Sequence, residues 1–368
     1  MTTATSSRAW TRTNAPERVL IIATRRIGDV LLATPVIRSL KQAWAQAKID
    51  ILVFSGTEGF VTANRDVDRV LTVPERPNFF QHARLVLKLA RKYDLALSLL
   101  AGDRPTLYAF VAGKRRAGLL LPTLKHRWKR SLLHAWVPLD ETDVHTVRAH
   151  LAVLATLGVA PIAEITASSS PEDRQLAESL LAPLQGARYA VLHVYPKFRY
   201  KMWTEAGWAA IARWLADRGI RVVLTGGAAA DELDYVARIA KEVPGALNVA
   251  GKLSLGGVAH VVSRAAVYIG PDTAITHAAA GLGVPTVALF GPSNPVKWGP
   301  WPAGHAAQAN PWRRTGTQAL GHVRLVQGAG ACVPCGFEGC ERHIESSSDC
   351  LTGLRPDTVI DAIRSVLE

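Results

Sequence analysis

The first half of the chain alternates short apolar runs with longer segments in which apolar residues recur every three or four positions. Strands are expected at 18–24, 49–54, 70–73 and 95–100, and helices at 29–44, 80–92 and 144–157. Runs that are apolar at successive positions are typical of strands buried on both faces. Because helices separate them, the pattern predicts a parallel sheet covered on each side.

The same rhythm restarts in the second half. Strands are expected at 189–195, 221–225, 247–249, 267–269 and 286–290, and helices at 204–218, 231–241, 255–264, 273–281 and 356–367. With 368 residues the chain also exceeds the size at which one hydrophobic core keeps growing. Two Rossmann-like lobes of the α/β class follow, with ligands expected beyond the carboxyl ends of the strands.

Composition places the boundaries between these parts. The lobes are expected at 17–160 and 188–355, joined by a Pro/Ser/Ala-rich linker with a helix inside it at 161–187. Residues 1–16 are rich in Thr, Ser and Arg and lack the apolar run of a secretory signal, so they predict a disordered leader. Residues 356–368 form the last amphipathic helix.

The net charge and the cysteine content indicate which partners and which cellular compartment to expect. The net charge of +13 favours anionic partners, namely phosphates, nucleic acid or a membrane surface. The run Lys114–Arg130 holds seven basic residues and no acidic one, and a solvated face is its alternative interpretation. No reader motif or aromatic-interleaved basic strand supports nucleic-acid binding. No apolar run is long enough to cross a bilayer, and the cysteines are no disulfide framework, so we expect a cytoplasmic protein.

The turn after the first strand carries Arg25, Arg26, Gly28 and Asp29. It has no G-x-G-x-x-G, and an acid there is unfavourable for a bound pyrophosphate, because a helix N-terminus already attracts anions. Asp29 has two interpretations. It either caps the following helix or is a carboxylate aimed into the cleft as a general base.

The second lobe has two turns suited to a nucleotide. Lys201 closes a basic loop that opens onto a helix, which suits a phosphate, with an ordinary basic surface loop as the alternative. A strand ends at Thr225, and Gly226 and Gly227 let the backbone approach a ligand closely. The acids that follow, Asp231 and Glu232, are placed to accept ribose or base hydrogen bonds.

A third turn of this lobe combines Asp272 and Thr273 at the start of a helix. Its free amides are expected to face the cleft and to receive the second phosphate of a diphosphate. His277 lies one turn further on, where a buried, hydrogen-bonded histidine is the alternative to a ligand contact.

The four cysteines of the chain, Cys332, Cys335, Cys340 and Cys350, fall within 19 residues. One pair is spaced as C-x-x-C, so a structural zinc or iron held by thiolates is one interpretation. Free or redox-paired thiols are the other. A catalytic cysteine is not expected, because no base accompanies it.

Taken in order, these motifs resemble the lipopolysaccharide heptosyltransferases, over roughly residues 18–365. The shared features are the arginine-flanked I-G-D-V-L-L-A-T-P opening, the His193-x7-Lys201-x-Trp203 loop, the G-G turn, and the Asp272-Thr273-x3-His277 helix with its F-G-P-S-N-P sequel. The stretch Gly102-Asp103-Arg104 and the cysteine-containing tail look most like the branch that adds the third heptose. The iron-binding cysteines of related autotransporter heptosyltransferases are spaced differently.

The resemblance implies an inverting enzyme of GT-B type, with a cleft between two Rossmann-like lobes. It would transfer heptose from ADP-heptose to the lipopolysaccharide inner core, at the cytoplasmic face of the inner membrane and in peripheral contact with its anionic surface. No cofactor is implied for catalysis. The first lobe would bind the acceptor and the second the nucleotide-sugar. A transferase or epimerase that uses another nucleotide-sugar, such as a UDP-sugar, is the alternative.

The roles implied fall into three groups. Asp29 would be the catalytic base. Donor contacts would come from Lys201, Asp272, Thr273, Thr225, Gly226, Gly227, Asp231, Glu232 and His277. Acceptor contacts would come from Arg25, Arg26, Asp103, Arg104, Arg115 and Arg116.

Overall fold

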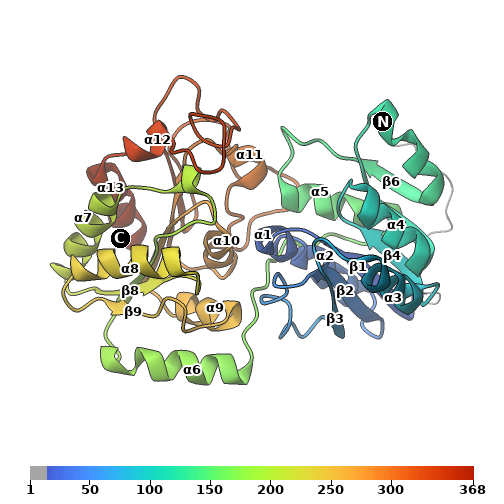
Figure 1. Cartoon of the computed structure of the whole chain (residues 1–368), viewed down its shortest axis with the longest axis horizontal. Coiled ribbons are helices and arrows are strands. Elements are labelled where there is room, and N and C mark those ends of the chain that lie inside the picture. The colour runs from blue at the N-terminus through green and yellow to red at the C-terminus, as the bar shows by residue number, and fades with distance from the viewer. Residues whose placement is uncertain (1–14) are drawn as a thin grey trace. The chain divides into compact units, whose positions relative to one another are not determined.

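The computed structural model describes residues 15–368, which form two compact units (Figure 1). Unit 1 runs to Thr166 and also contains Gly304–Asn310, and unit 2 contains Ala167–Ala303 and Pro311–Glu368. The expected leader lies almost wholly outside the described residues. Within the described part of the chain, no helix has the length and hydropathy needed to cross a membrane.

Unit 1 is built on a six-stranded parallel sheet in the order β3-β2-β1-β4-β5-β6. The strands are β1 (Arg18–Ile22), β2 (Lys48–Phe54), β3 (Arg69–Val73), β4 (Tyr93–Ser98), β5 (Gly113–Leu120) and β6 (Ala135–Pro138). The helices are α1 (Ile27–Leu31), α2 (Thr34–Ala43), α3 (Phe79–Leu89), α4 (Asp103–Ala112) and α5 (Thr146–Ala152), with 3-10 helices η2 (Leu124–Leu132) and η3 (Val153–Leu157). The order reverses between β1 and β4, which is where ligands bind in open α/β sheets.

Unit 2 repeats this plan with the order β12-β13-β11-β10-β7-β8-β9, parallel except for β12. Its strands are β7 (Tyr189–His193), β8 (Arg221–Thr225), β9 (Leu247–Asn248), β10 (Val267–Pro271), β11 (Thr286–Phe290), β12 (Gln318–Leu320) and β13 (Val323–Gln327). Its helices are α6 (Pro171–Leu181), α7 (Glu205–Ala216), α8 (Ala230–Lys241), α9 (Leu255–Ser263), α10 (Ala274–Gly281), α11 (Pro295–Trp298), α12 (Asp349–Thr352) and α13 (Pro356–Leu367), with 3-10 helices η4 (Ala182–Leu184) and η5 (Arg199–Lys201). The reversal point here lies between β7 and β10.

The apolar runs form strands because both faces of each central strand are covered. In β1, Val19 through Ile22 are completely buried, and every residue of β7, β10 and β11 is buried. A central parallel strand with helices on both sides has no polar face, so alternation is lost. In unit 2, side chains of α7, α8 and α13 pack against those of β7, β8, β10 and β11 in one hydrophobic core.

Several elements differ from the expected pattern. The single helix expected at 29–44 is two helices, because the chain turns at Leu32 and Ala33 and α2 begins at Thr34, with Pro35 in its first turn. The basic run Lys114–Arg130 begins in β5 and continues into η2. The helix within the expected linker is α6, which packs on α9 inside unit 2.

Candidate functional site

Three neighbouring strands of unit 2 end beside the residues that carry its motifs. β10, β7 and β8 are adjacent, with Ile269 opposite Leu192 and His193 opposite Thr225. Parallel strands present their carboxyl ends at one edge of the sheet. The turns that start at Asp272, Val194 and Gly226 therefore meet at that edge, at the reversal point.

Lys201 and Asp272 form the central contact of this edge. The ammonium of Lys201 lies 2.5 Å from Oδ2 of Asp272, and the hydroxyl of Ser293 donates to the same oxygen over 2.6 Å. The Asp272 side chain is buried, whereas that of Lys201 is 19% exposed. One oxygen thus receives two donors, and the cation beside it keeps access to solvent.

The electrostatics keep Asp272 ionised. Burial alone would raise the pKa of its carboxyl, but the Lys201 ammonium, with His277 and the Ser293 hydroxyl, holds that pKa below its usual range. His277 lies 3.8 Å from the other oxygen of Asp272, and burial lowers the pKa of its imidazole to about 4 despite the carboxylate. His277 is therefore neutral at pH 7. Its Nδ1 is buried and accepts or donates no hydrogen bond within the described residues.

Helix α10 begins at this edge. Thr273 is its N-cap, and its hydroxyl oxygen accepts from the amide of Thr276 over 3.4 Å. The Thr276 hydroxyl is itself shared with Pro271 O and the Tyr268 hydroxyl. The cap is therefore fixed by the strand that precedes it. The first amides of a helix and its dipole favour an anion at such a position.

The β7 and β8 ends supply a polar turn. The Thr225 hydroxyl lies 3.1 Å from Nδ1 of His193, whose pKa burial lowers to about 4. Glu232 accepts from the amide of Gly227 over 2.6 Å, so its carboxylate closes the Gly226-Gly227 turn.

The other acid of this turn is also engaged within the protein. Asp231 accepts from the Tyr195 hydroxyl over 2.6 Å. Its hydrogen bond raises the pKa of Tyr195 to about 12. The acids expected to meet a ribose or base therefore shape the loops around them.

Asp29 lies at the reversal point of unit 1, just after β1. The N-cap of α1 is Arg26, so Asp29 is the third residue of the helix and not its cap. Its side chain is 7% exposed, and Nε of Arg25 lies 3.8 Å from its Oδ1. The capping interpretation is therefore wrong, and Arg25, Arg26 and Asp29 share one turn.

A pocket of about 360 Å³ lies at the same edge of the sheet. It is lined by Thr24, Phe54, Glu75, Arg76, Gly102, Asp103, Arg104 and Pro105. The Thr24 hydroxyl is buried without a hydrogen-bond partner in the described chain, and Arg104 donates to Glu75 O over 2.7 Å. An unpaired buried hydroxyl beside basic side chains suits a polar ligand.

Asp103 and Arg104 therefore line one pocket. A buried lysine that the sequence did not indicate as a site residue, Lys129, holds Asp103 in place. Lys129 is completely buried, donates to Ala101 O over 2.8 Å, and lies 2.5 Å from Oδ1 of Asp103. Its hydrogen bond lowers the pKa of Asp103. The only sequence signal was that Lys129 belongs to the basic run.

Arg115 and Arg116 lie elsewhere. They occupy the amino-terminal part of β5, where Arg115 pairs with Leu95 and Arg116 with Ala96. Five residues of strand separate Arg115 from the carboxyl end at Leu120, a distance of about 16 Å. The structure does not bring these two arginines to the edge that holds Asp29.

The four cysteines form no disulfide bond. Burial raises the pKa of Cys350 to about 11, and the charges of Cys335, Cys340 and Cys332 add to the effect. Across residues 15–368, no three His, Cys, Asp or Glu side chains are grouped so as to hold a metal ion. The structure therefore gives the expected thiolate site no support.

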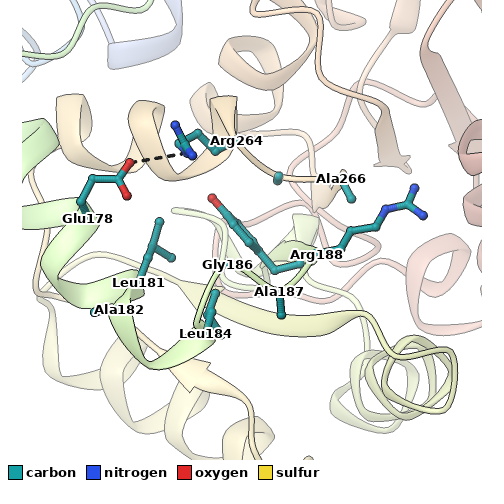
Figure 2. A pocket seen from close by; sticks show the side chains of 11 residues that line it. Glu178, Leu181, Ala182, Leu184, Gly186, Ala187, Arg188, Arg264 and Ala266 are labelled. Carbon is teal, nitrogen blue, oxygen red and sulfur yellow. Dashed lines mark ion pairs between the residues drawn. The ribbon is translucent and has the colours of Figure 1, made fainter.

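Figure 2 shows a second pocket, of about 440 Å³, in unit 2. It lies between the end of α6 and the segment that enters β7, beside the Glu178–Arg264 ion pair. This is the amino-terminal edge of the sheet, opposite the motifs. None of the expected site residues lines it.

The fold and the polar residues at the two sheet reversal points define a two-lobed α/β protein with one Rossmann-like sheet in each lobe. A solved structure of a glycosyl transferase family 9 protein from Veillonella parvula has a TM-score of 0.76 and 20% identity, and the match covers 95% of this chain and 97% of that one. The solved structure of E. coli heptosyltransferase WaaC with ADP has a TM-score of 0.70 and 22% identity, and the match covers 95% of this chain and 99% of that one. These matches confirm the GT-B type fold.

Sequence comparison gives the family. The model of glycosyltransferase family 9 (heptosyltransferase) matches residues 83–315. Lipopolysaccharide heptosyltransferase 3 from Escherichia coli is 31% identical over 290 residues, covering 74% of this chain and 83% of that protein. The chain therefore belongs to glycosyltransferase family 9 and is a glycosyltransferase, which confirms the expected family.

Proposed function

We propose that this glycosyltransferase moves heptose from ADP-heptose onto the lipopolysaccharide inner core, with inversion, and that it adds the third heptose. The observation that carries this is the Lys201–Asp272 pair at the start of α10. Two Escherichia coli relatives named lipopolysaccharide heptosyltransferase 3 support the acceptor. The solved Escherichia coli enzyme with ADP-2-deoxy-2-fluoro heptose supports the donor.

Unit 2 binds the donor in this proposal. As the glycosidic bond breaks, negative charge grows on the leaving diphosphate, and Lys201 with the first amides of α10 stabilises it. The partly exposed ammonium of Lys201 is poised for that contact. Asp272 holds Lys201 in place and accepts sugar hydroxyls, and Thr225, Gly226 and Gly227 position the nucleotide.

Three further side chains complete the donor site in this proposal. Asp231 and Glu232 order the loops around the nucleotide through Tyr195 and the Gly227 amide. Neutral His277 offers its unpaired Nδ1 to the donor.

Unit 1 binds the acceptor. Asp29 removes the proton from the acceptor hydroxyl that attacks the heptose. Its burial and the nearby Arg25 fix its orientation. Arg26, Asp103 and Arg104 bind the phosphorylated sugar core.

The proposed acceptor determines where in the cell the enzyme works. The enzyme acts in the cytoplasm, at the inner-membrane face where a lipid-anchored core is accessible, and in peripheral contact with anionic lipid. The basic side chains of unit 1, including Arg115 and Arg116, supply that contact in place of a direct acceptor role. Nucleic acid is not a partner.

Nucleotide selectivity tests the donor assignment. ADP should raise the melting temperature more than UDP does at equal concentration, because a ligand that binds only the folded state stabilises it by mass action. Lys201→Ala should reduce the ADP-dependent shift, while Lys241→Ala, an exposed lysine on α8, should keep it. A larger shift with UDP would favour the UDP-sugar alternative and contradict the proposal.

A further inference from the structure

Nearly all of the net charge of the chain lies in one segment of unit 1. Between Arg76 and Arg130 there are thirteen Lys and Arg residues against two acids, Asp94 and Asp103. That is a formal charge of +11, where the whole chain has +13. Both acids are already paired, with Lys114 and Lys129.

The same segment carries most of the exposed large apolar side chains. Among those the structure describes, seven of ten belong to it: Phe79, Phe80, Leu87, Leu107, Phe110, Leu124 and Trp128. Phe80 is 81% exposed and Leu124 80%. Single exposed apolar residues are ordinary, but a contiguous group rimmed by polar residues marks an interaction surface.

The fold gathers these residues on three neighbouring elements, α3, α4 and η2. α4 packs against both α3 and η2, and Figure 1 shows α3 and α4 together in unit 1. His82 on α3 lies 3.3 Å from the Tyr108 hydroxyl on α4, and buried Lys129 fixes η2 to the start of α4. These contacts hold the three elements as one surface.

Apolar and basic side chains are interleaved on this surface. On α3, Phe80, Arg84 and Leu87 follow one another at helical spacing, and all three are exposed. The guanidinium of Arg116 lies 5.0 Å from the ring of Phe110. Aromatic and leucine side chains among Lys and Arg are typical of segments that lie in a membrane interface.

We propose that α3, α4 and η2 form a bilayer-docking surface, which inserts its apolar side chains at the boundary of headgroups and acyl chains. The basic residues then contact anionic headgroups. The positive charge of this surface favours an anionic bilayer over a second copy of the chain. In a dimer through this surface, two segments of formal charge +11 would face and repel each other. The inference deepens the proposed function, since it names the partner that presents a lipid-anchored acceptor.

Sedimentation with vesicles of phosphatidylethanolamine, with and without phosphatidylglycerol, tests this surface. The full chain should bind the anionic vesicles, and Phe79→Ser/Phe80→Ser/Leu124→Ser should lower the partition coefficient at least about tenfold. The control is Leu176→Ser/Phe337→Ser, which removes two apolar residues of unit 2 that are 47% and 48% exposed and should bind as the wild type does.

A second pair of variants tests the contribution of the basic side chains to vesicle binding. This pair keeps the proposal testable if the apolar variant fails to fold. Arg84→Glu/Lys88→Glu should weaken binding to anionic vesicles about tenfold or more. Arg218→Glu/Lys241→Glu changes the net charge equally on exposed positions of unit 2 and should have less than about a twofold effect.

Three results would overturn the proposal: wild-type protein that ignores anionic vesicles, unit 2 controls that lose as much binding as the unit 1 variants, or self-association that only the unit 1 variants abolish. Vesicles without lipopolysaccharide need neither donor nor acceptor. A failure here would therefore leave the transfer proposal standing, and a failed transfer assay would leave this one standing.

Discussion

At the scale of single residues, Asp29 shows what the sequence could predict about the site and what it could not. An acid in the first βα turn without a glycine fingerprint indicated something other than pyrophosphate binding. The sequence left open whether it capped the helix, and only the backbone placed the cap at Arg26. Cap position depends on where the helix starts, to within a residue, and sequence patterns do not resolve that.

Replacing Asp29 by Asn should lower kcat about 10²–10⁴-fold, because the amide cannot accept the proton of the acceptor hydroxyl. The ADP-dependent rise in melting temperature should stay at the wild-type value, since Asp29 belongs to unit 1. Asp66→Asn is the matched control: Asp66 is another buried acid of unit 1, paired with Arg38, and it should keep kcat. Wild-type turnover by Asp29→Asn would remove it from the mechanism.

The pairing of Lys201 with Asp272 illustrates what single residues cannot reveal. Each was a candidate from its own motif, but they lie 71 positions apart in the chain. Their contact depends on β7 and β10 being neighbours in the sheet. The sequence placed Ser293 in a motif without a role and did not indicate Thr24, because serine and threonine are common in turns and only the fold shows which of them lie at a site.

At the scale of elements, long apolar runs were predicted well and mixed segments were not. The bounds of β8, β11 and α13 agree with the expected ranges, because burial on both faces or a strong amphipathic pattern leaves little ambiguity. α4 and β5 were missed. α4 has apolar residues on both its buried and its exposed side, and β5 opens with Lys114, Arg115 and Arg116.

The N-terminus of α10 allows a prediction at this scale. Thr273→Ala removes its cap and should lower the free energy of unfolding by about 1 kcal/mol. It should also raise the KM for the donor about two- to fivefold, because a displaced helix terminus weakens an anion interaction worth about 0.3–1 kcal/mol.

Ser254→Ala is the control for that variant, because Ser254 caps α9 in the same unit through the amide of Gly257. It should cost similar stability by urea denaturation while leaving the KM unchanged. Equal KM values for both cap variants and the wild type would show that the start of α10 does not meet the donor.

At the scale of the whole molecule, the two-unit plan could be predicted because the strand–helix rhythm occurs twice. The sequence did not predict that the chain crosses back from unit 2 to unit 1. Residues 304–310 return to unit 1, where Asn310 accepts hydrogen bonds from the His145 amide and the Arg148 side chain. No local pattern marks that return. The concentration of charge in unit 1 was visible only in part, as the run Lys114–Arg130.

The most direct test of the central claim is a transfer assay with purified protein, ADP-heptose and inner-core acceptor from a strain that lacks this chain. Mass spectrometry of the product and quantification of the released nucleotide are read together. We predict an acceptor heavier by one heptose and one ADP released per transfer, with no product from UDP-sugars. Transfer from a UDP-sugar, or no heptose added from ADP-heptose, would contradict the account.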